Sequence, residues 1–150
     1  MWNNPAVIEW SGFLLDSFRV AAGRELIERY SPRVDAQELF IMARVVVSHG
    51  LGADPIFNYA NRAAQGLWNL DWARFTTMPS RLSAEPVDQA VREQMLAQVV
   101  QVGYVSDYRG VRVTTTGRRF EFSGAEVWNV QNAQGERVGL AATFVSWTFL

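Results

Sequence analysis

Few side chains in this chain can carry out covalent or metal chemistry. The 150 residues contain no Cys and a single His, His49, and every one of the 14 basic residues is Arg. The absence of thiols excludes disulfides, thiolate nucleophiles and cysteine-based zinc or iron–sulfur sites. The absence of Lys excludes Schiff-base chemistry and the lysine of a phosphate-binding loop. Since one imidazole does not make a histidine metal site, we expect no metal.

Acid–base and nucleophilic catalysis have little support either. Ser48 and His49 are adjacent on an expected strand, so their side chains face opposite ways and cannot form a nucleophile–base pair. No pattern brings a carboxylate pair such as Asp54 and Glu126 together. We therefore expect no catalytic residues, and an enzyme that uses carboxylates is only a third alternative.

The charge pattern indicates neither a polyanionic partner nor a membrane. The net charge is −1, and the arginines of the last third are interspersed with acidic residues: Arg109, Arg112, Arg118, Arg119 and Arg137 with Asp107, Glu121, Glu126 and Glu136. A solvated strand face is therefore favoured over a nucleic-acid surface. The longest uncharged apolar run spans only thirteen residues, Val138 to Leu150, whereas a membrane helix needs ~20. We expect a cytoplasmic protein.

The first third of the chain is expected to be helical. Apolar residues spaced by threes and fours predict an amphipathic helix from Pro5 to about Ala22, capped by Asn4. A short helix capped by Asp35 follows, through about Met42. We expect residues 1–42 to form an N-terminal helical segment that packs on a sheet or on a partner, and residues 43–150 to form the main domain.

The rest of the chain alternates between strands and helices. Residues 44–48 and 56–59 read as a strand hairpin, Asn61 as a helix cap, and residues 86–102 as a long helix that ends at Gly103. From residue 111 the apolar period becomes two, with a possible bulge at Gly124 and a final strand over residues 138–149.

The final strand has apolar residues on both faces, so both faces of its sheet must be covered. The internal helices can cover one face, and the N-terminal helix or a partner subunit the other. The residues that we expect at this helix–sheet or subunit interface are Trp10, Phe13, Leu14, Phe18, Val145 and Trp147.

This order of elements resembles a PAS domain, and the amino-acid sequence of several segments resembles the MEKHLA family more closely. The matching segments are Leu14–Phe18, Gly23–Leu26, Val47–Gly50, Asp54–Trp68, Pro79–Pro86 and Gly117–Phe120. The resemblance implies an α+β, PAS-like five-stranded antiparallel sheet, with helices on one face and the amphipathic N-terminal helix on the other. The family occurs as small stand-alone bacterial proteins and at the C-terminus of plant class III homeodomain–leucine zipper regulators. It implies sensing or regulated association and transfers no catalytic residue.

The resemblance also bears on cofactors. Pro79–Leu82 lies where light-oxygen-voltage PAS domains carry Asn-Cys-Arg-Phe, and Ser80 takes the place of the cysteine. We therefore expect no flavin–cysteinyl adduct, while non-covalent flavin binding stays open. Haem-binding PAS domains usually carry their iron-ligating His on the long helix. Since that helix has no His here, no haem is expected. Arg81 either meets a ligand phosphate or carboxylate or, as we favour, pairs with a nearby carboxylate to hold its loop.

Aromatic and polar residues could line a ligand pocket, with Ala141 and Ala142 leaving room, although core packing is the default explanation for such residues. The candidate ligand-binding residues are Phe57, Tyr59, Trp68, Trp72, Arg81, Met95, Phe122, Trp128, Asn129 and Thr143. The function that we expect is a PAS-like sensory or regulatory module that binds a small apolar or aromatic ligand, controls protein association as a homodimer or with another protein, or does both. The alternative is a structural dimerisation or docking module with a filled core.

Overall fold

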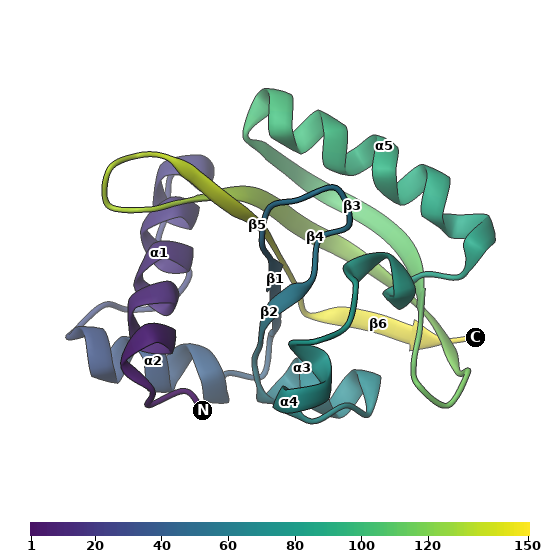
Figure 1. The fold of residues 1–150 in the computed structure, drawn as a ribbon, viewed down its shortest axis with the longest axis horizontal. Coiled ribbons are helices and arrows are strands. Elements are labelled where there is room, and N and C mark those ends of the chain that lie inside the picture. The colour runs from purple at the N-terminus through teal and green to yellow at the C-terminus, as the bar shows by residue number, and fades with distance from the viewer.

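The computed structural model describes residues 1–150 as an α+β fold around one antiparallel sheet (Figure 1). The helices are α1 (Pro5–Ala22), α2 (Pro32–Ile41), α3 (Arg62–Trp68), α4 (Trp72–Phe75), the 3-10 turn η1 (Ser80–Ser83) and α5 (Pro86–Val102). The strands are β1 (Val45–His49), β2 (Phe57–Ala60), β3 (Tyr104–Val113), β4 (Arg119–Gln131), β5 (Arg137–Phe144) and β6 (Ser146–Phe149). The strand order is β2-β1-β5-β4-β3, and β6 also pairs with β4.

Local capping signals explain where the helices begin. Asn4 caps α1 by accepting a hydrogen bond from the amide of Ala6. The second helix begins earlier than predicted, because Ser31 caps it. Asp35 instead lies inside α2 and accepts hydrogen bonds from the Tyr30 amide and from Arg29. None of the helices combines the length and hydropathy that a membrane span requires.

The predicted final strand is two strands, so the sheet has six strands and not five. It breaks at Val145, where β5 gives way to β6. On β4, the partner of both, Gly124 adopts a positive φ of 65° between the segment paired with β6 and the segment paired with β5. A bulge bends a strand and adds local twist, so one straight partner strand cannot follow all of β4.

Two cores lie on the two faces of this sheet. In Figure 1, α1 and α2 lie on one side of the sheet, its outer face, and α5 on the other, its inner face. The inner core includes Phe57, Trp68 and Phe122. The outer core, under α1, contains the fully buried Leu14, Phe18 and Trp128. The Phe18 and Trp128 rings meet edge to face at 4.9 Å, and the Trp128 indole N–H donates to the Leu14 carbonyl. Helix α1, which was predicted to cover one face of the sheet, therefore covers the outer face of the sheet of its own chain.

The long helix α5 meets the sheet through a narrower stripe than its sequence suggested. Val87, Val91 and Val102 have the spacing of one apolar helix face, but these side chains are exposed. The buried residues are Arg92, Met95 and Val99. Because α5 packs over the edge strand β3 and its neighbour β4, only one stripe of the helix has sheet beneath it.

On the outer face, a buried carboxylate on β4 interacts with side chains from three other segments. Glu126 accepts hydrogen bonds from Arg24 at 2.7 Å and from the Tyr104 hydroxyl at 2.6 Å, and Arg44 lies 3.7 Å away. Burial by itself raises the pKa of Glu126, but the hydrogen bonds from Arg24 and Tyr104 outweigh it and hold the pKa below its ordinary value of 4.5. The folded state therefore favours the ionised form.

Replacing Glu126 by Gln should lower the free energy of unfolding at neutral pH by about 1–2 kcal/mol. A depressed folded-state pKa contributes stability that is present above the unfolded-state pKa and is lost as the pH falls through the folded-state pKa. The stability lost in E126Q, relative to the wild type, should therefore shrink as the pH falls below 4.5, as measured by urea unfolding at each pH. The control is E121Q on the same strand, whose partner Arg109 is exposed. An equal deficit for both variants, unchanged with pH, would contradict the assignment.

Candidate functional site

A cavity of about 70 Å³ lies between the inner face of the sheet and α5. Of its 18 lining residues, 13 are hydrophobic. They are Val47, Ser48, His49, Phe57, Trp68, Ser83, Arg92, Met95, Leu96, Tyr108, Arg112, Phe122, Ala125, Val127, Leu140, Ala141, Ala142 and Phe144. One water needs roughly 10–15 Å³ of such space, so the cavity has room for several waters or a small organic group.

The sequence builds this cavity by opposing small and large residues. Ala125 and Ala142 lie on the neighbouring strands β4 and β5 and leave room above the sheet. Phe122 and Phe144 stack at 4.8 Å to form one wall, and Trp68 meets Phe144 edge to face at 6.3 Å. Such rigid aromatic walls around a mostly apolar space are typical of small-molecule sites.

The structure brings some of the predicted ligand-binding residues together here. Phe57, Trp68, Met95 and Phe122 line the cavity. Phe57 reaches it from β2, Trp68 from the end of α3, Met95 from α5 and Phe122 from β4.

Other predicted residues belong to the opposite face of the sheet. Tyr59 and Trp128 lie in the outer core, where Trp72 packs on Tyr59 with ring centres 5.6 Å apart. Thr143 is fully buried and donates to the Val45 carbonyl. The register between β1 and β2 shifts at Asn58, so Phe57 and Tyr59 point to opposite faces although they are two residues apart.

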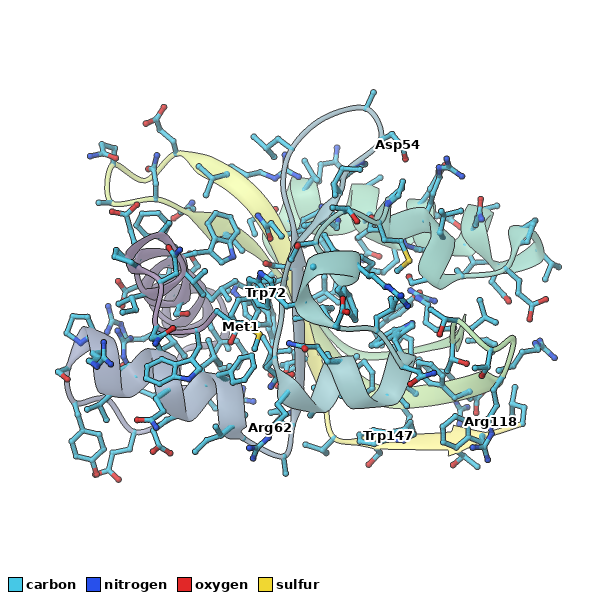
Figure 2. All side chains as sticks on the ribbon, turned by 60° about the horizontal axis from the view of Figure 1, so that its bottom comes forward. Met1, Asp54, Arg62, Trp72, Arg118 and Trp147 are labelled. Carbon is cyan, nitrogen blue, oxygen red and sulfur yellow. The ribbon has the colours of Figure 1, made fainter.

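Two polar candidates have partners within the chain. Asn129 donates to the Val99 carbonyl and accepts from Arg137, which fastens the last turn of α5 to the sheet. Arg81 is half-exposed and pairs with Asp54 at 3.0 Å. Asp54 lies on the loop that joins β1 to β2, and this loop projects beyond the sheet (Figure 2). Arg81 therefore pairs with a loop carboxylate, which is the alternative that the sequence favoured.

The predicted interface residues separate into two groups. The α1 side chains Trp10, Phe13, Leu14 and Phe18 pack in the outer core of their own chain. Trp147 packs against the inner core, and Val145 is exposed at the break between β5 and β6.

None of the five polar residues that line the cavity was predicted as a site residue, and three of the five are basic. Arg92, Arg112 and His49 all line it and are all buried. Arg112 had been assigned to a solvated strand face, which is wrong, because its guanidinium covers the Phe122 ring 5.1 Å from its centre. Arg92 lies three residues before Met95, which places both on one side of α5. That spacing was the signal available for Arg92. No group of three or more His, Asp or Glu side chains is placed to hold a metal ion.

Comparison with known proteins identifies the family. The family model of the MEKHLA domain matches residues 8–149. The homeobox-leucine zipper protein ATHB-9 of Arabidopsis thaliana is 30% identical over 101 residues, which are 65% of this chain and 12% of that protein's length. The chain therefore matches only a small part of that plant protein.

Solved structures share the fold at low sequence identity. The PAS domain of a protein from Colwellia psychrerythraea has a TM-score of 0.64 at 12% identity, covering 74% of this chain and 92% of that one. The photo-excited blue-light photoreceptor Vivid has a TM-score of 0.65 at 14% identity, covering 95% and 98%. An RNA-binding light-oxygen-voltage receptor has a TM-score of 0.65 at 13% identity, covering 79% and 36%. The fold is thus PAS-like, as expected, and the chain belongs to the MEKHLA domain family.

Proposed function

We propose that this domain is a sensory or regulatory module that binds a small organic molecule in the cavity between its sheet and α5. The observation that carries the proposal is the cavity itself, which combines aromatic walls with a few buried polar groups. Sites for small molecules have this composition. The PAS-like fold is consistent with such a role, and no constellation of side chains favours catalysis.

A ligand here would act on α5. This helix contributes Arg92, Met95 and Leu96 to the cavity, while its solvent side carries exposed valines. A ligand that fits one position of α5 better than another shifts the population toward that position. The exposed side of the helix would then present a different surface to a partner.

The proposal is tested by native mass spectrometry and absorbance spectroscopy of freshly purified protein, followed by a thermal-shift screen of small acids, bases and neutral compounds. We expect at least one compound to bind saturably with one-to-one stoichiometry. Ala142→Leu should abolish that binding by filling the cavity, whereas Ala90→Leu on the exposed side of α5 should leave it unchanged. No saturable binding by any class, or equal binding by both variants, would overturn the proposal.

A second candidate function is protein association without a ligand. It is favoured by Val87, Val91 and Val102, which are 76%, 61% and 69% exposed on α5. A homodimer that is free of bound mass, and that Val91→Glu returns to monomer, would support this candidate. A monomer at all concentrations in sedimentation measurements would exclude the homodimer.

A further inference from the structure

Two arginines are buried in the cavity with no carboxylate oxygen within ion-pair distance. Arg92 of α5 and Arg112 of β3 are only 6% and 8% exposed, and both line the cavity. None of the lining residues is Asp or Glu, and neither arginine has a carboxylate oxygen within 4.0 Å, although seven other arginines do. Buried charges in proteins are normally paired, because an uncompensated one costs several kcal/mol.

Few of the N–H donors of either guanidinium have a hydrogen-bond partner within the protein. Arg92 donates one hydrogen bond, to the Ser80 hydroxyl, and Arg112 donates one, to the Val111 carbonyl. Each guanidinium carries five N–H donors. Burial, followed by the neighbouring charge of Arg112, lowers the pKa of Arg92 to about 10. Since a pKa of about 10 leaves Arg92 ionised at neutral pH, two positive charges line one small cavity.

The fold makes room for this arrangement. Gly110 is the residue of β3 opposite Phe122. A Cβ at Gly110 would lie 2.9 Å from the Phe122 ring and 3.1 Å from the Arg112 guanidinium. The missing side chain lets Arg112 and Phe122 lie together across the strand, where the ring face stabilises the cation.

A third polar side chain of the cavity, His49, has one ring nitrogen without a hydrogen-bond partner. The Nδ1 of His49 lies 2.9 Å from the Gly50 carbonyl, so this nitrogen carries the proton of the neutral ring. Burial, and then the charges of Arg92 and Arg137, lower the pKa of His49, so the ring is neutral at pH 7. Its Nε2 is buried with no hydrogen-bond partner. Among its apolar walls, the cavity therefore has two guanidinium groups, and one ring nitrogen, Nε2 of His49, that lacks a hydrogen-bond partner.

We infer that the cavity binds a small organic carboxylate, with its carboxylate group on Arg92 and Arg112 and its apolar body against the aromatic walls. This inference rests on the proposed function, since it names the chemical class of the molecule bound there. A guanidinium matches a carboxylate through paired N–H donors. The small volume and the mostly apolar lining favour a monocarboxylate over a phosphate, which would need more donors to replace its hydration.

The test compares phenylacetate, the neutral analogue 2-phenylethanol and inorganic phosphate by isothermal titration and thermal shift at constant ionic strength. We expect phenylacetate to bind saturably and to raise the melting temperature most. Equal binding of 2-phenylethanol would overturn the inference while leaving the proposed function intact. Stronger stabilisation by inorganic phosphate, or no saturable phenylacetate binding, would overturn it as well. The wider screen of the preceding section then decides separately whether the cavity binds anything.

Variants give a second, independent readout. Arg92→Met and Arg112→Met should each weaken phenylacetate binding by about 10- to 100-fold, the effect of losing a hydrogen bond to a charged group. Without ligand, each variant should be at least as stable as the wild type, because an uncompensated buried charge is removed. Arg81→Met is the control, since Arg81 is half-exposed and pairs with Asp54 outside the cavity. If the Arg92 and Arg112 variants melt earlier and bind phenylacetate as the wild type does, the two arginines are structural and the inference fails.

Discussion

Asn61→Ala is expected to lower the free energy of unfolding by about 3–5 kcal/mol, because it removes a cap and leaves several buried backbone groups unpaired. Asn61 is fully buried. Its side-chain oxygen accepts from the amides of Val46 and Ala64 at 3.0 and 3.1 Å. Its side-chain nitrogen donates to the carbonyls of Leu39 and Arg44 at 3.2 and 2.7 Å. One amide thus joins the end of α2, the start of β1 and the first turn of α3.

The matched control for this prediction is Asn4→Ala. Asn4 is also a helix cap, but it is exposed and its side chain accepts a single helical hydrogen bond, from the Ala6 amide. We expect a loss of about 0.5–1 kcal/mol, the usual effect of an exposed cap. Urea unfolding, with the slope compared among the variants, measures both changes. Equal losses for the two variants would show that the buried connections of Asn61 contribute nothing beyond capping.

Phe18→Ala is expected to lower the free energy of unfolding by about 3–5 kcal/mol, the range for truncating a fully buried aromatic side chain. Phe18 is 0% exposed and contacts Trp128 edge to face, and the Arg24 guanidinium lies over its ring at 5.1 Å. The substitution opens a cavity between α1 and the sheet. We also expect the variant to bind a hydrophobic dye and to aggregate more readily, since the outer face of the sheet is apolar.

Val20→Ala is the control within the same helix. Val20 is 74% exposed, so its truncation should change stability by no more than about 0.5 kcal/mol. Thermal and urea unfolding of the two variants, with sedimentation to follow their oligomeric state, give the comparison. Similar behaviour of F18A and V20A would mean that α1 does not cover the sheet, and the account of the outer core would be wrong.

Short-range signals predicted most of the elements. Asn4 was predicted to cap the first long helix and Gly103 to end the other, and the structure confirms both. Asn61 was identified as a cap for the same reason. Caps and turn residues act on their own neighbours, so their meaning does not depend on the rest of the fold.

The face of the sheet to which each strand side chain points was less predictable. Alternation assigns a side chain to a face only while the strand is regular, because one extra residue moves every later side chain to the other face. The shift at Asn58 separates Tyr59 from Phe57, and Gly124 lies between the inward-facing Phe122 and the outward-facing Trp128. This is why the aromatic candidates divide between two cores.

From the sequence alone, the resemblance of its segments to known ones gave the class of fold and the family. The sequence also determined most of the helix ends and the chemistry that the missing Cys and Lys exclude, because these follow from local contacts and from composition. Only the tertiary structure decided that α1 covers its own sheet, that the last strand breaks at Val145, and that Arg92 and Arg112 meet inside a cavity. Arginines usually lie at the surface, and nothing local distinguishes these two from the exposed ones. What buries them is the packing of α5 across β3, a contact between segments whose register the chain sets only when it folds.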